Sequence, residues 1–222
     1  MKVKIMAQNN RNYQKEMEKI IEGLSGQRKS LLLHSCCAPC SSAVLEKLQE
    51  IFEITVFYYN PNISERLEYQ KRVEEQKRLI EAFNQKEPSC PIKIIDGDYE
   101  PQEFYAIARG LETCPEGGER CFRCYALRLE KTAQLAKEGN YDFFSTTLTI
   151  SPLKNAGKLN EIGEEMALKY ETTFLPSDFK KKEGYKRSIE LSKEYDLYRQ
   201  NFCGCGYSKA ESLKREKQEK NI

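Results

Sequence analysis

The sequence predicts an α/β protein whose parallel sheet of about five strands carries helices on both faces. Short apolar runs such as Leu31–Leu33 alternate with longer segments of helical periodicity, which is the order that successive βαβ units produce. With 222 residues, the chain is long enough to bury the core of one domain without disulfide or metal staples. Hydrophobic residues make up 39% of the chain and aromatic residues 10%, so the composition is that of a folded protein.

The elements are expected in a regular order. The spacing of apolar residues over 13–24 predicts an amphipathic helix that ends in the glycine-containing stretch 23–26. The strand at 31–34 leads into a helix, for which Ser41 and Ser42 are candidate N-caps. Further strands are expected at 52–59, 92–96, 143–147 and 172–175, and further helices at 64–83, 102–109, 119–137, 155–170, 185–198 and 209–220.

We expect a single domain over residues 1–222. Its parts are an N-terminal helix (1–29), an α/β core (30–176) and a helical C-terminal extension (177–222). No apolar stretch approaches the ~20 residues that a membrane span needs, and residues 1–10 have no signal-peptide core. We therefore expect a cytoplasmic protein without a membrane partner. In such a reducing compartment, clustered cysteines more often bind metal or do redox chemistry than form structural disulfides.

Six of the nine cysteines form two groups with the spacing of metal ligands. Cys36, Cys37 and Cys40 directly follow the first strand, and Cys114, Cys121 and Cys124 lead into a helix. The carboxyl ends of parallel strands and the N-termini of helices both favour such a site, so the two groups are expected to meet over the sheet. With one histidine in the chain, the ligands are mainly sulfur. Both a structural zinc and an iron–sulfur cluster satisfy this pattern.

The remaining cysteines give two different predictions. Cys203 and Cys205 flank Gly204, whose backbone freedom suits the tight ring that a disulfide between them would close. Such a bond is strained and easily reduced, so we interpret the pair as redox-active. The alternative is that the pair supplies two further metal ligands. Cys90 has no partner in the sequence and is expected to be an isolated loop thiol.

Six stretches of the chain carry a resemblance to a known family. In order, they are His34–Cys40, Tyr59–Ile63, Gly97–Tyr99, Gly117–Tyr125, Thr146–Lys154 and Gln200–Cys205. Together, over about residues 30 to 208, they resemble the QueH-type epoxyqueuosine reductases. More loosely, the first strand and its loop resemble those of the PP-loop ATPases, with Ser35–Ser41 in place of the phosphate loop. This second resemblance implies a HUP-like, Rossmann-type topology.

The resemblance implies a tRNA-modifying oxidoreductase. The reaction is the two-electron reduction of the epoxide of epoxyqueuosine, at the tRNA wobble position, to queuosine, the last step of tRNA queuosine biosynthesis. The resemblance implies a [4Fe-4S] cluster held by Cys36, Cys37, Cys121 and Cys124. Cys40 or Cys114 can replace one of these ligands, or can hold an adjacent mononuclear iron together with Asp98. The same resemblance implies that Cys203 and Cys205 alternate between dithiol and disulfide.

Two further residues are candidates for the chemistry. His34 can donate a proton to the opening epoxide. The alternative is that it is a buried strand residue whose two ring nitrogens are both hydrogen-bonded within the protein. Asp98 follows the third strand and is therefore expected at the carboxyl end of the sheet, unless it belongs to an ordinary turn.

A tRNA partner requires basic residues for its phosphates. The candidates are Lys180, Lys181, Lys182, Lys186 and Arg187, which lie among aromatic residues that can stack a splayed base. A solvated helix face is the alternative. The electron donor is expected to be ferredoxin- or flavodoxin-like. Two other functions stay open, namely a zinc-stabilised RNA-binding module and a thiol–disulfide oxidoreductase centred on Cys203 and Cys205.

Overall fold

The computed structural model describes residues 11–219 and contains one parallel sheet, with strand order β3-β2-β1-β4. β1 lies in the interior of this sheet, and its last residue, His34, pairs with Phe57 of β2 and Thr146 of β4. The strands are β1 (Lys29–His34), β2 (Phe52–Tyr58), β3 (Lys93–Asp96) and β4 (Phe143–Thr146). The predicted α/β class with parallel strands is thus confirmed.

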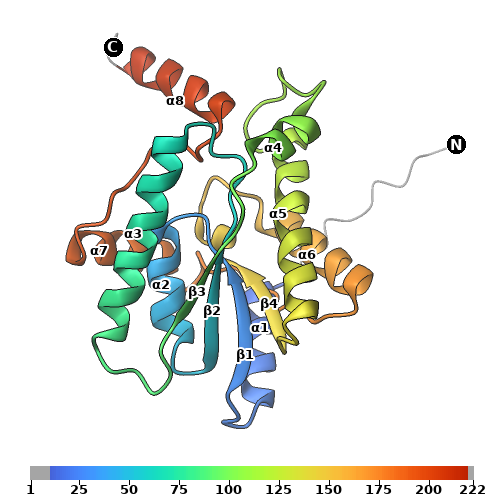
Figure 1. The fold of residues 1–222 in the computed structure, drawn as a ribbon, viewed down its shortest axis with the longest axis vertical. Coiled ribbons are helices and arrows are strands. Elements are labelled where there is room, and N and C mark those ends of the chain that lie inside the picture. Colours follow the sequence, from blue (N-terminus) through green and yellow to red (C-terminus); the bar gives the residue numbers. More distant parts are fainter. Residues whose placement is uncertain (1–10, 220–222) are drawn as a thin grey trace, which may run out of the picture.

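Helices cover both faces of the sheet (Figure 1). Four helices pack on one face and two on the other, while α4 packs against α5 and α8 follows at the C-terminal end. The first face carries α1 (Tyr13–Gly23), α2 (Ala38–Leu48), α3 (Arg66–Asn84) and α7 (Gly184–Glu194). The others are α4 (Pro101–Ala108), α5 (Glu119–Glu138), α6 (Ala156–Tyr170) and α8 (Gly206–Glu219), with the 3-10 helix η1 (Thr147–Ile150) after β4.

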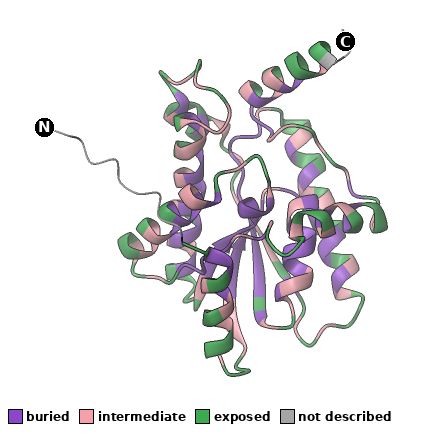
Figure 2. Ribbon diagram, turned by 180° about the vertical axis from the view of Figure 1, so that it is seen from behind, coloured by how far each residue is buried: buried purple, intermediate pink, exposed green. Residues whose placement is uncertain are grey.

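The apolar run in β1 is explained by burial on both sides. Leu31 and Leu33 belong to the hydrophobic cluster on the α2 face, whereas Leu32 belongs to the cluster on the α5 face. All three are fully buried, as are most residues of the sheet (Figure 2). Burial of one such side chain contributes roughly 1.5–3 kcal/mol to stability. A continuous apolar strand is therefore the expected sequence for the interior of a covered parallel sheet.

The predicted fifth strand is reduced to a single bridge. Phe174 pairs with Phe144 beside β4, and its neighbours continue as irregular chain. The bridge is held by Phe144 N–H donating to Thr173 O and Leu175 N–H donating to Phe144 O. Pro176 follows and has no N–H with which to extend the ladder. The sheet therefore has four strands with a short addition at the β4 edge.

The expected N-caps of α2 are wrong. The helix begins at Ala38, three residues before Ser41, with Cys37 at the cap position and no side-chain cap hydrogen bond. Pro39 fits the first turn because the N–H that it lacks has no intrahelical partner there. The hydroxyl of Ser41 instead donates to Ala38 O at 3.1 Å, within the helix. Because the helix begins earlier than expected, the cysteines that follow the first strand lie at the helix N-terminus.

The other boundaries agree with the prediction to within a few residues, apart from the C-terminal helices. α7 ends at Glu194, before the expected 198, and α8 begins at Gly206, before the expected 209. The predictions for residues 1–10 and 220–222 lie outside the described residues. Within 11–219, no helix combines the length and the apolarity required to cross a bilayer.

Candidate metal and redox centre

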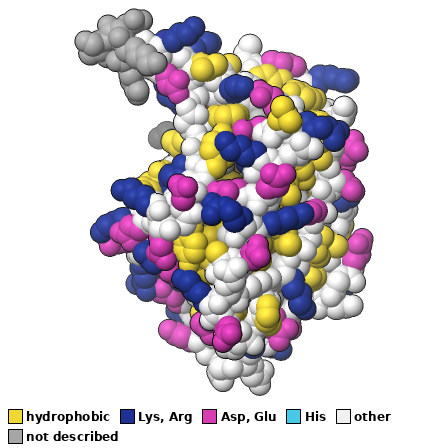
Figure 3. Space-filling view, turned by 60° about the vertical axis from the view of Figure 1, so that its left-hand side comes forward, with side chains coloured by type: hydrophobic (Ala, Val, Ile, Leu, Met, Phe, Trp, Pro, Cys, Tyr) yellow, Lys and Arg dark blue, Asp and Glu magenta, His cyan; other side chains and the backbone are white. Residues whose placement is uncertain are grey.

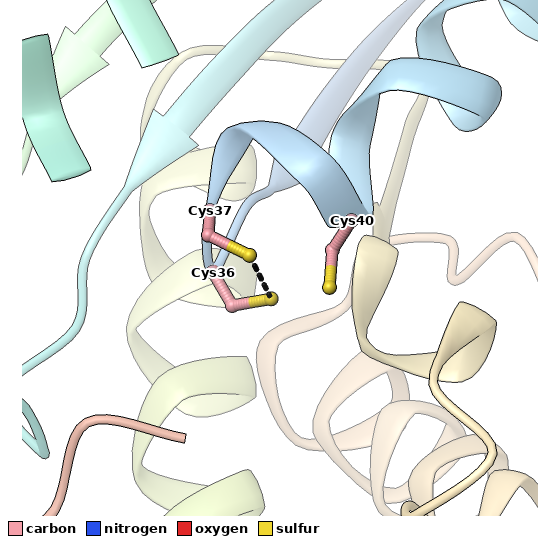
Figure 4. Close-up of side chains that lie close together, drawn as sticks. All are labelled: Cys36, Cys37 and Cys40. Carbon is pink, nitrogen blue, oxygen red and sulfur yellow. Dashed lines mark hydrogen bonds between the residues drawn. The ribbon is translucent and has the colours of Figure 1, made fainter. Parts of the chain in front are cut away.

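Three cysteines converge where β1 meets α2. The Sγ atoms of Cys36, Cys37 and Cys40 all lie within 4.8 Å of one another, and we call these residues the cysteine trio. Cys36 and Cys37 come from the turn after the strand, with their sulfurs 3.9 Å apart, and Cys40 projects from the first turn of α2 (Figure 4). The turn and the helix start thus direct three sulfurs toward one space.

The trio shares its protons unequally. Hydrogen bonds with Cys37 and Cys40 lower the pKa of the Cys36 thiol well below its ordinary value, and Lys154 and Arg128 act in the same direction. The shared hydrogen bond with Cys36 raises the pKa of Cys37 and of Cys40. Deprotonation is therefore favoured at Cys36 over Cys37 and Cys40. A thiolate is the form that ligates metal.

The second cysteine group lies at the start of α5. Cys121 and Cys124 occupy its first turns, and the N–H of Gly117 donates to Cys121 Sγ at 3.2 Å. Burial raises the pKa of both thiols. Cys114 lies in the loop before α5. Cys124 of this group packs with Cys205. The second cysteine group therefore lies beside the pair Cys203 and Cys205, although Cys124 and Cys205 are 81 residues apart in the sequence.

The Cys-x-Cys loop is held by the turn after β2 and by α3. Asn62 and Arg72 each donate to the Cys203 carbonyl oxygen at 3.2 Å. Gly204 has a φ of +113°, and a Cβ added there would lie 2.7 Å from Ile63. This site therefore requires glycine.

The two sulfurs of this loop lie 3.5 Å apart as free thiols. The hydrogen bond between them lowers the pKa of Cys203 well below its ordinary value and raises the pKa of Cys205. The two thiols therefore differ in acidity, and deprotonation is favoured at Cys203.

Two adjoining cavities connect the cysteine groups. The first, of about 240 Å³, is lined by the cysteine trio, and we call it the trio cavity. The second, of about 20 Å³, is lined by Cys121, Cys124 and Cys205. The residues that line both are Glu116, Arg128, Leu153, Lys154 and Cys203. Cys203 thus lies between the trio and the second cysteine group.

The four expected cluster ligands are divided between these cavities. Cys36 and Cys37 line the trio cavity beside Cys40, whereas Cys121 and Cys124 line the second cavity. Cys40 is a third sulfur within 4.8 Å of both members of the first pair, and Cys114 lines neither cavity.

His34 is fully buried and both of its ring nitrogens are used. Nδ1 lies 2.9 Å from Thr146 Oγ1, and Nε2 lies 3.1 Å from the Tyr59 carbonyl oxygen. Burial, with a further contribution from Arg128, lowers the pKa of His34 to about 3, so the ring is neutral. His34 lines neither cavity, and this geometry favours the alternative of a satisfied strand histidine.

Asp98 lines neither of the two cavities. It follows β3, which forms the edge of the sheet, and its side chain is exposed to solvent outside both cavities. The neighbouring Tyr99 donates its hydroxyl to Ile63 O at 2.9 Å, which orders this turn.

Four of the five basic candidates for RNA binding have an acidic partner in the same chain. The pairs are Lys180–Asp178, Lys182–Glu18, Lys186–Glu183 and Arg187–Glu46, at 2.5 to 3.3 Å. Lys181, Lys182 and Arg187 line a hollow of about 280 Å³ together with Lys47 of α2, and we call these four residues the basic groove. Acidic and basic side chains are also interspersed over the face drawn in Figure 3.

The sequence analysis did not identify the charged residues that face the sulfurs. Arg128 is fully buried on α5, where it donates to Cys124 O and to Asn60 Oδ1, both at 3.3 Å. Its position four residues after Cys124 places both on one helix face, which was an available signal. Lys154 and Glu116 stand in loops, where no periodicity reveals the direction of a side chain.

The residues of the trio cavity fit a sulfur-ligated metal group. Iron–sulfur clusters and zinc both take thiolate ligands, and three sulfurs already converge within 4.8 Å. Buried Arg72 and Arg128 provide positive charge that offsets an anionic centre.

Comparison with known proteins identifies the family. The family described as "Epoxyqueuosine reductase QueH" matches residues 31–211. The chain is 43% identical to the epoxyqueuosine reductase QueH of Staphylococcus epidermidis, over 89% of this chain and 84% of that protein. It is also 43% identical to the protein of that name from Streptococcus pyogenes, over 89% and 78%. The corresponding protein of Thermotoga maritima is 36% identical, over 85% and 93%. The resemblance seen in the sequence is therefore confirmed, and this chain belongs to the epoxyqueuosine reductase QueH family.

Proposed function

We propose that this chain carries out the reaction for which its family is named, the reduction of epoxyqueuosine in tRNA to queuosine. The observation that carries the proposal is the pair of adjoining cavities in which Cys203 lies between the trio and the second cysteine group. A metal-binding set and a dithiol beside one another suit a reaction that consumes two electrons and two protons. The trio cavity offers space next to both for the epoxide.

We propose a [4Fe-4S] cluster as the cofactor. Cys36, Cys37, Cys121 and Cys124 are its ligands in this proposal, and Cys40 or Cys114 are the alternatives. The proximity of Cys40 to the first pair supports it as a ligand, either of the cluster or of an adjacent mononuclear iron. When bound, such a group supplies one-electron transfer. The chain's own contribution is to hold the ligands beside the buried arginines Arg72 and Arg128.

The Cys203–Cys205 dithiol is the second redox element of the proposal. Its main chain is fixed by Asn62 and Arg72, so its sulfurs keep their place at the boundary between the cavities. Arg72 is itself buried and paired with Glu68 at 2.7 Å. A loop held in this way can alternate between dithiol and disulfide without moving the sheet.

The partner is a tRNA that carries epoxyqueuosine, and the basic groove is a candidate for contact with its phosphates. Lys181 has no acidic partner among the described residues, so its charge is available to RNA. Lys180 and Lys186 extend the same surface in this proposal. The electron donor is a ferredoxin- or flavodoxin-like protein, and the location is the cytoplasm.

Anaerobic metal analysis combined with a tRNA assay tests the function. We expect brown protein that contains iron and acid-labile sulfide. With titanium(III) citrate as reductant, it should convert epoxyqueuosine to queuosine in purified tRNA, detected by mass spectrometry of the nucleosides. Colourless protein with stoichiometric zinc and no conversion would favour the RNA-binding module. Conversion of a disulfide substrate but not of the tRNA would favour the thiol–disulfide oxidoreductase.

A further inference from the structure

Lys154 is the exception among the cations that line the two cavities. Its Nζ has no carboxylate oxygen within 4.0 Å and no hydrogen bond to any residue of the described range 11–219. Each of the others donates a hydrogen bond to a protein group. These pairs are Arg72 with Glu68, Arg120 with Leu111 O, Arg128 with Asn60 and Arg199 with Ser192.

The fold directs this lysine toward the sulfurs. Lys154 lies between η1 and α6, where its N–H donates to Ser151 O at 3.2 Å. Asn155 caps the next helix by accepting from Lys158 N–H, which fixes the chain on the other side. Held at both ends, Lys154 contributes its side chain to the trio cavity and to the second cavity.

The charges around Lys154 keep it protonated. Burial acts to lower its pKa, but Cys203, Tyr125 and Cys36 raise it, and the pKa lies above the ordinary value of a lysine. A permanent ammonium without a carboxylate partner is costly in a partly buried place unless it meets negative charge there. Cys203 and Glu116 line both cavities with Lys154, and Cys36 lines the trio cavity. The Glu116 carboxylate is already paired with Arg215 at 3.7 Å, so the groups left for the ammonium are the sulfurs.

We propose that Lys154 is a catalytic residue whose ammonium stabilises negative charge on the Cys203 sulfur and on the epoxide oxygen as its bond to carbon breaks. The second part rests on the proposed function. The reaction breaks both C–O bonds of the epoxide and forms one C=C bond. It takes up two electrons from a low-potential one-electron carrier and two protons from solvent, so that the oxygen leaves as water. A fixed cation facing that oxygen lowers the barrier without reorganisation.

The test compares Lys154→Met, which removes the charge, with Lys154→Arg, which keeps it. Lys158→Met is the matched control, since Lys158 stands one turn further on, paired with Glu161 at the surface. Three quantities are measured on anaerobic holoenzyme. They are the single-turnover rate with titanium(III) citrate, the Kd for epoxyqueuosine tRNA, and the pH dependence of the rate at which iodoacetamide alkylates Cys203, followed by mass spectrometry.

We expect Lys154→Met to lower the single-turnover rate by about 10²–10³-fold, as loss of one transition-state donor does elsewhere. The pH at which Cys203 becomes reactive toward iodoacetamide should rise, because the ammonium that favours its deprotonated form is lost. The Kd for tRNA and the iron content should stay at the wild-type values. Lys154→Arg should restore most of the single-turnover rate and of the pH dependence of alkylation, and Lys158→Met should match the wild type throughout.

Other results overturn the proposal. A single-turnover rate of Lys154→Met within about threefold of wild type excludes the catalytic role. If the iron content or the tRNA affinity of Lys154→Met falls together with its single-turnover rate, Lys154 has a structural role instead. If the wild type does not reduce the tRNA, the proposed function is wrong, and so is the part of the proposal that concerns the epoxide oxygen. The alkylation rates then still decide whether Lys154 stabilises the Cys203 thiolate.

Discussion

Cys203 is the residue on which most of the proposed chemistry depends. It lines both cavities, and its sulfur is 3.5 Å from the Cys205 sulfur. We expect Cys203→Ala to leave the iron content near normal and to abolish or strongly reduce turnover, because the proposed ligands are other residues. Iron analysis and the tRNA assay measure this. Loss of iron in the variant would make Cys203 a metal ligand, and full turnover would leave the loop without a redox role.

The other cysteines divide into ligand candidates and one isolated thiol. We expect Cys37→Ala and Cys121→Ala to lose iron and activity together, since both remove proposed ligands. Cys90→Ala is the control, because Cys90 lines neither cavity and its thiol donates a hydrogen bond to the Pro91 carbonyl oxygen, at 4.0 Å. Iron content and visible absorbance of anaerobic protein distinguish these variants. A comparison of Cys40→Ala with Cys121→Ala identifies which of the two completes the cluster, and iron loss in Cys90→Ala would contradict the assignment.

At the scale of elements, the Cys-x-Cys loop depends on one backbone conformation. Gly204→Ala places a methyl group 2.7 Å from Ile63 in a left-handed conformation, and we expect it to destabilise the docked loop by about 2 kcal/mol or more. Amide hydrogen exchange over residues 203–208 should accelerate, and turnover should fall. Gly206→Ala is the matched control, since its added methyl meets only Ser64 Oγ at an ordinary 3.5 Å. Equal exchange in both variants would show that the loop is not strained at Gly204.

The α2 and α7 elements form the walls of the basic groove. We expect the double substitution Lys47→Gln with Lys181→Gln to weaken tRNA binding, because two cations near the RNA backbone are lost. The slope of log affinity against log salt should decrease by about one for each phosphate contact removed. Lys193→Gln, on the same α7, serves as control. An unchanged slope in the double variant would assign these lysines to a solvated surface.

At the scale of the whole molecule, one hydrophobic core crosses the three predicted parts of the chain. Met17 of α1, Leu31 of β1 and Leu191 of α7 belong to the same buried cluster. We therefore expect a single cooperative unfolding transition, with coincident fluorescence and circular dichroism curves. A chain that ends at residue 176 should not fold, because the α2 face that Leu191 covers would be exposed. Two separate transitions in the full chain would contradict the single domain, which stays a prediction.

The sequence by itself determined the α/β class, the order of nearly all elements and the membership of the family. Periodicity and turn residues are local, so they predict that β1 is a buried strand and that α5 begins near Cys121. They also predicted the two cysteine groups at a strand end and a helix start. The family resemblance then followed from motifs that can be recognised without any knowledge of the contacts.

Only the tertiary structure decided which of these residues meet. The strand order places β2 between β1 and β3, so the Asp98 turn is separated from the trio by a whole strand, although both follow carboxyl ends. The register of β1 places the His34 ring between Thr146 and Tyr59, where both nitrogens are satisfied. Lys154 joins the cysteines for the same reason, because strand order and loop path are set by long-range packing that no local pattern encodes.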